Sequence, residues 1–120
     1  MLILNGLWTT VLITVLAAVF GTILGGWLGP EMMLYIENNS GKSLTVQTRN
    51  VSVNGFMVDA TFSCDIFAGK KAVDGITFSS SDMEKNDITS MEEIELSFHI
   101  FDEDSWNTIV DTPPITIKVK

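Results

Sequence analysis

Residues 93–100 read EIELSFHI, and this stretch decides the fold class. Every second position is apolar, namely Ile94, Leu96, Phe98 and Ile100. Successive side chains of a β-strand point to opposite faces, so this spacing places all four apolar side chains on one face. The pattern therefore predicts a central strand of a sheet with that face against the core.

The same two-residue period recurs along residues 31–120. Short alternating segments follow one another at intervals of roughly ten residues, which is typical of a β-sandwich. Asn54-Gly55 lies between apolar residues and predicts a hairpin, because both central positions of a type I′ turn need positive φ. Ser81 and Glu84 form a capping box that predicts a helix of one or two turns. We therefore expect residues 31–120 to form one all-β, antiparallel sandwich domain.

Residues 1–30 have a different composition, because they contain no Asp, Glu, Lys or Arg. Residues 7–28 read LWTTVLITVLAAVFGTILGGWL, which as a helix would span roughly 33 Å and match a hydrocarbon core of about 30 Å. This run predicts a transmembrane helix, with residues 1–30 as an anchor that contacts membrane lipid through residues 7–28. A cleavable signal peptide is the less favoured alternative, because the run lacks a basic start and an A-x-A-like cleavage site.

One face of this predicted helix carries small residues at a spacing of four, Gly21, Gly25 and Gly29. Such a stripe allows close helix–helix approach and predicts a homo-oligomer formed through the helix. The simpler explanation is that glycine is common in membrane helices. Lys42 and Arg49 lie close to the helix and favour a cytoplasmic domain, whereas the acidic, Ser- and Thr-rich composition favours export. We expect an extracytoplasmic domain.

The charge of the chain narrows the class of partner. The 120 residues include 7 basic and 15 acidic side chains, a net charge of −8, all of it within residues 31–120. An acidic domain lacks the positive field that attracts phosphate, so we expect no nucleic-acid partner. The plainest role of this negative charge is to keep the domain soluble.

Catalytic chemistry is not indicated. The single cysteine, Cys64, is expected to be a small buried hydrophobe, and the single histidine, His99, is expected on the polar face of its strand. No nucleophile, phosphate-binding or zinc-protease motif is present. We therefore predict a protein that is not an enzyme, with no catalytic residue, cofactor or metal.

An acidic turn after the central strand is the candidate interaction loop, with Asp102, Asp104 and Trp106 as its residues. Its carboxylates would suit calcium, but Trp106 occupies the third ligand position of an EF-hand loop and no glycine follows, so a structural turn is expected. Trp106 has two interpretations. It closes the sandwich as a core or rim aromatic, or it is an exposed binding anchor.

Three stretches carry a family resemblance: residues 51–58 (VSVNGFMV), 68–72 (AGKKA) and 98–106 (FHIFDEDSW). They resemble an uncharacterised family of immunoglobulin-like, membrane-anchored cell-envelope domains of Gram-positive gut bacteria (Firmicutes-type). The resemblance covers residues 31–120 and implies an immunoglobulin-like sandwich after one membrane helix, without a known activity. Members of that kind sometimes carry a zinc ribbon. No CxxC pair is present here, so the zinc ribbon is absent or lies upstream of this start, and the second alternative would make the chain a fragment.

Together these observations predict a non-catalytic interaction module at the cell envelope, with a protein or glycan partner. The alternative is a structural or assembly subunit that self-associates through the glycine-rich helix.

Overall fold

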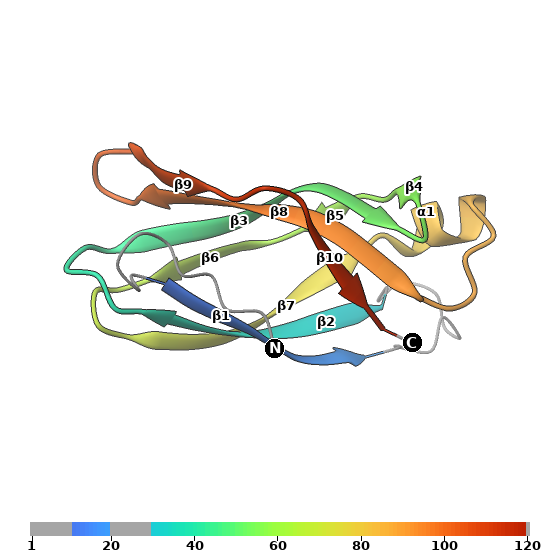
Figure 1. Ribbon diagram of the computed structural model, residues 1–120, viewed down its shortest axis with the longest axis horizontal. Helices are drawn as coiled ribbons and strands as arrows, with labels where there is room; N and C mark the ends of the chain where they lie inside the picture. Colours follow the sequence, from blue (N-terminus) through green and yellow to red (C-terminus); the bar gives the residue numbers. More distant parts are fainter. Residues whose placement is uncertain (1–10, 20–29, 120) are drawn as a thin grey trace.

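The computed structural model describes residues 11–19 and 30–119, with backbone alone for residues 16–19 (Figure 1). Two antiparallel sheets face each other, and the side chains between them form one hydrophobic core. The all-β, sandwich-like architecture predicted from the sequence is confirmed.

The first sheet has the order β1-β2-β7-β5, formed by Val11–Val19, Glu31–Asn38, Lys71–Phe78 and Ala60–Thr61. The second has the order β10-β8-β3-β4, formed by Ile115–Lys118, Glu93–Asp102, Leu44–Val53 and Phe56–Met57. Two further strands join this second sheet: β6 (Ser63–Ile66) pairs with β3, and β9 (Thr108–Asp111) pairs with β8. One helix, α1 (Ser80–Lys85), lies between β7 and β8 in the sequence.

Strand β8 is central and buries one face, as its alternation predicts. It pairs with β3 on one side and with β9 and β10 on the other. At most 1% of the surface of its four alternating apolar residues is exposed: Ile94, Leu96, Phe98 and Ile100.

The predicted transmembrane helix is wrong for nine of its residues. Val11–Val19 form strand β1, which pairs antiparallel with β2, and within the described residues no helix is long and apolar enough to cross a membrane. Val11 and Ile13 are buried in the sandwich core, and their register partners are Asn38 and Ile36. Four of the first five residues of β1 are β-branched, which favours a strand. The remaining parts of the run, residues 7–10 and 20–28, lie outside the described residues.

The two local turn signals have different outcomes. Asn54 and Gly55 have φ of 51° and 87° and connect β3 to β4, so the predicted hairpin is confirmed. The predicted cap is wrong by two residues, because Ser79 rather than Ser81 caps α1 and accepts from the backbone N–H of Asp82 at 3.2 Å. Ser79 is still extended after β7, as an N-cap requires, whereas Ser81 already lies inside the helix.

Candidate functional site

Three turns lie together at one end of the sandwich, at the left of Figure 1. They are residues 39–43 between β2 and β3, 67–70 between β6 and β7, and 103–107 between β8 and β9. Backbone hydrogen bonds join them to neighbouring strands and turns: Gly69 N–H donates to the carbonyl of Asn38 at 2.9 Å, and Glu103 N–H donates to that of Ser43 at 3.0 Å. We call these three turns the loop end.

Asn38 fixes the first turn. Its side chain is buried, and its Nδ2 donates to the carbonyls of Lys42 at 2.7 Å and of Ile66 at 2.9 Å. Its Oδ1 accepts from both the backbone N–H and the hydroxyl of Ser40. One amide therefore joins the end of β2 to its own turn and to the end of β6.

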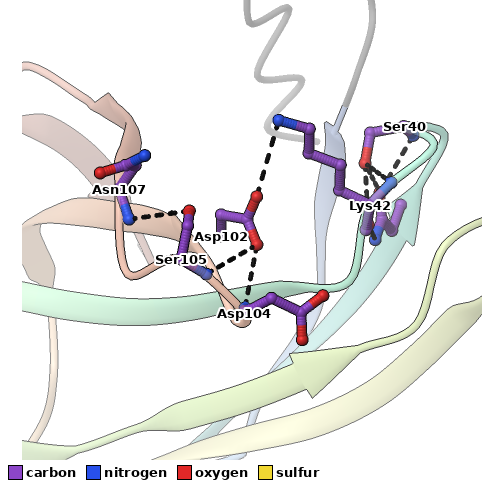
Figure 2. A network of polar contacts seen from close by, with 7 residues as sticks. Ser40, Lys42, Asp102, Asp104, Ser105 and Asn107 are labelled. Carbon is purple, nitrogen blue, oxygen red and sulfur yellow. Dashed lines mark hydrogen bonds and ion pairs between the residues drawn. The ribbon is translucent and has the colours of Figure 1, made fainter.

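Asp102 fixes the third turn and contacts the first (Figure 2). Its Oδ1 accepts from the backbone N–H groups of Asp104 at 2.9 Å and Ser105 at 3.4 Å, and its Oδ2 lies 3.6 Å from the Lys42 ammonium. The hydrogen bond from Asp104 N–H is the main reason that the pKa of Asp102 lies below its ordinary value. Asp102 is therefore a buried carboxylate that shapes the turn.

Asp104 differs from Asp102 although both belong to the predicted interaction loop. The Asp104 residue is exposed, and its carboxylate points away from Asp102 in Figure 2. Because the Asp104 carboxylate points away, the two carboxylates do not converge on a common point. Within residues 11–19 and 30–119, no group of three or more His, Cys, Asp or Glu side chains could hold a metal ion.

Trp106 is an exposed aromatic residue at the tip of the β8–β9 hairpin. Its side chain does not close the core, because 76% of the residue surface is exposed. The backbone adopts φ of 66°, and its N–H donates to the carbonyl of Asp102 at 2.8 Å. Its ring stacks on Phe101, with centroids 5.6 Å apart and planes inclined by 17°. The indole is thus supported from beneath by a side chain that is itself buried.

The outer face of β8 continues this aromatic support. The ring of His99 lies 5.3 Å from that of Phe101, and its Nδ1 pairs with the carboxylate of Asp111 on β9. His99 therefore faces outward, as predicted. We call Trp106, Phe101 and His99 the aromatic platform.

Phe67 was missed by the sequence reasoning. It lies in the second turn of the loop end and is 66% exposed. The alternation of β6 provides the signal, because Cys64 and Ile66 are buried and the next residue must point outward. The loop end thus presents two large exposed aromatic side chains, Trp106 and Phe67.

The other candidate positions are less informative. Cys64 is free and buried, as predicted, and burial is the main cause that raises the pKa of its thiol to about 11, followed by repulsion from Asp74. Gly21, Gly25 and Gly29, the predicted helix-association face, lie outside the described residues.

Comparison with known proteins adds little. No protein-family model matches the chain, and no curated protein matches it. Among solved structures, a FixG-related protein from Vibrio parahaemolyticus aligns with a TM-score of 0.48 and 11% sequence identity, over 92% of this chain and 97% of that one.

Proposed function

We propose that this chain is an immunoglobulin-like, non-catalytic interaction module of the cell envelope, and that it binds its partner through the loop end. The observation that carries the proposal is the 76% exposure of Trp106 on a turn held by buried polar contacts. The partner is a glycan or a protein.

The strand order supports the immunoglobulin-like part of the proposal. The sheet β1-β2-β7-β5 has the order of strands A-B-E-D of that fold, and β10-β8-β3 has the order of G-F-C. In this correspondence the β2–β3 turn takes the place of the B–C loop, and the β8–β9 turn is the first part of the connection that takes the place of the F–G loop. Those two loops form part of the binding end of variable domains.

The energetics of Trp106 support a binding role. Leaving a large apolar ring in water forgoes the free energy that burial would contribute, and tryptophan is enriched among the residues that dominate binding energy. Stacking on Phe101 and the turn that Asp102 fixes restrict the indole before a partner arrives. Binding therefore has less side-chain and loop entropy to overcome than it would with a mobile loop.

The chemistry around the indole is compatible with both partner classes. A flat aromatic face suits the apolar face of a sugar ring or a side chain of a protein. Asp104 and Asp111 lie close to Trp106 in the sequence, and both are exposed. Their carboxylate oxygens can accept hydrogen bonds from hydroxyl or amide donors. The net charge of −8 disfavours nucleic acid.

The non-catalytic part of the proposal is supported by the two residues that are most often reactive. A nucleophilic cysteine needs a lowered pKa, whereas burial raises the pKa of Cys64 to about 11. His99 already pairs with Asp111, and its ring packs beside Phe101. Both residues thus have structural explanations.

Binding to Gram-positive cell walls tests the proposal. The full chain would be sedimented with two wall preparations, one that retains its proteins and one treated with protease. A glycan partner predicts binding to both preparations, and a protein partner predicts binding to the first alone. Trp106→Ala should weaken binding at least about tenfold, which corresponds to about 1.4 kcal/mol.

Phe56→Ala is the matched control, because Phe56 is a 48% exposed aromatic residue of β4, at the opposite end of the sandwich (Figure 1). It should bind like the parent. No binding to either wall preparation, or equal losses from Trp106→Ala and Phe56→Ala, would contradict the proposal.

The location is tested separately. The family resemblance supports a place at the cell envelope, with the sandwich on the extracytoplasmic side. Protease added to intact cells should degrade the sandwich domain. Protection from the protease would place the domain in the cytoplasm.

A further inference from the structure

We propose that the outer edge of strand β1 is a self-association site, at which β1 pairs antiparallel with β1 of a second copy of this chain. The site is distinct from the loop end, so the inference does not depend on the proposed function.

The backbone of β1 is paired on one side. Eight register pairs join it to β2, from Val11 opposite Asn38 to Val19 opposite Glu31. Among the strands of residues 11–19 and 30–119, none pairs with its other side. An edge of this length presents a row of N–H and C=O groups that another strand can satisfy.

The remaining edge strands are protected by short length, charge or proline, whereas β1 has only a bulge between Val15 and Ala17. None of them exceeds four residues: β4 and β5 have two each, and β6, β9 and β10 have four each. Strand β7 is longer and pairs with β5 only at Thr77 and Phe78, but its stretch without a partner on that side contains Lys71 and Asp74. Strands β6, β9 and β10 each contain a charged residue, namely Asp65, Asp111 and Lys118. Strand β10 also follows Pro113-Pro114. Short length, charge and proline are the usual means by which proteins prevent edge-to-edge pairing. Strand β1 has nine residues and contains no charged residue, proline or glycine.

The charge distribution indicates why a second copy would use this edge. Each copy has a net charge of −8, so most approaches between two copies bring acidic surfaces together. The strand β1 lies within the only long stretch of the sequence without charge, residues 1–30. Pairing along β1 brings two uncharged strands together at the edge of the sheet.

The outward face of β1 is also suited to a copy of itself. Leu12 and Thr14 alternate with the buried Val11 and Ile13 and are only partly exposed. Antiparallel pairing of a strand with itself is symmetric about a two-fold axis, so one surface satisfies both partners. The first sheet of one copy and the first sheet of the other would then form one continuous sheet. Leu12 and Thr14 of both copies would lie on its outer face, close to the axis.

Sedimentation of the full chain in a mild non-ionic detergent tests the proposal. The parent should form a reversible dimer as its concentration rises. Thr14→Lys should raise the dimer dissociation constant at least about tenfold, because two ammonium groups would meet across the axis. Thr116→Lys is the matched control, since it introduces the same charge on the edge strand β10, and it should dimerise like the parent.

A cross-linking measurement decides the matter if Thr14→Lys fails to fold. With Cys64 replaced by alanine, a single cysteine at Thr14 should give a covalent dimer on oxidation. A cysteine at Val73, which is 60% exposed on β7 of the same sheet, should give little. A parent that stays monomeric would overturn the proposal. So would equal cross-linking at Val73, which would indicate non-specific association.

Discussion

Strands β8 and β1 are both rich in apolar residues, yet their sequences predict different structures. In β8 apolar and polar residues alternate, and the predicted strand is confirmed. In β1 the sequence VLITVLAAV has hardly any alternation, and the predicted helix is wrong for these residues. Both strands nevertheless turn alternate residues toward the core: in β1, Val11 and Ile13 are buried and the partly buried Val15 packs against them. An alternating pattern identifies a strand because it records the solvated face as well as the buried one.

A continuous apolar run says less about secondary structure than an alternating pattern does. It gives length and hydrophobicity, and neither distinguishes a strand from a helix. For β1 the decision is tertiary, because β2 needs a partner along its edge and the core accepts Val11 and Ile13. The preference of β-branched residues for strands is the only local signal in the same direction.

The largest expected effect concerns the core face of β8. Phe98 is 1% exposed, and Phe98→Ala should lower the free energy of unfolding by about 3–5 kcal/mol, because it leaves a large cavity. Urea denaturation measures this loss. A midpoint equal to that of the parent would show that this face of β8 is misassigned.

Strand β1 gives a slightly smaller effect. Ile13→Ala should lower the free energy of unfolding of the sandwich by about 2–4 kcal/mol, because Ile13 is fully buried opposite Ile36. Leu12→Ala, a neighbouring change on the outer face, should cost less than about 1 kcal/mol. The two variants would behave alike if residues 11–19 were a helix outside the domain.

The turn at the end of β8 should depend on pH. The folded pKa of Asp102 lies below its ordinary value, so its contribution to stability is present above the ordinary aspartate range and is lost as the pH falls through the folded pKa. Asp102→Asn should therefore be less stable than the parent at neutral pH, and the difference should narrow in acid. Denaturation at a series of pH values measures this, with the exposed Asp104→Asn as a control close to the parent. A difference that stays constant down to strongly acidic pH would contradict the role of the Asp102 charge.

Calcium should have the smallest effect. Asp102 already accepts hydrogen bonds and pairs with Lys42, so thermal melts in calcium and in EDTA at matched ionic strength should coincide. Even a site of millimolar affinity would add about 1.4 kcal/mol at tenfold excess of calcium. A rise of the melting temperature that Asp104→Asn abolishes would replace the structural reading of this turn with a metal site.

The candidate site was predictable in part. The acidic turn and Trp106 stand out in the sequence because they follow the clearest strand. The exposure of Trp106 was not predictable, because it depends on a positive φ and on stacking against Phe101. The roles of Asn38 and Lys42 were not predictable either, since their partners come from strands far along the chain.

The most direct test of the central structural claim, that residues 11–19 form a strand of the sandwich, is an intrachain disulfide. Leu12 and Glu37 are register partners on the outer face of β1 and β2, and paired residues of adjacent strands lie close enough for a disulfide. With Cys64 replaced by alanine, Leu12→Cys combined with Glu37→Cys should oxidise within one chain, as should the control pair Gln47→Cys and Ser63→Cys between β3 and β6. Oxidation of the control pair alone would contradict the account, because a helix across a membrane keeps residue 12 away from residue 37.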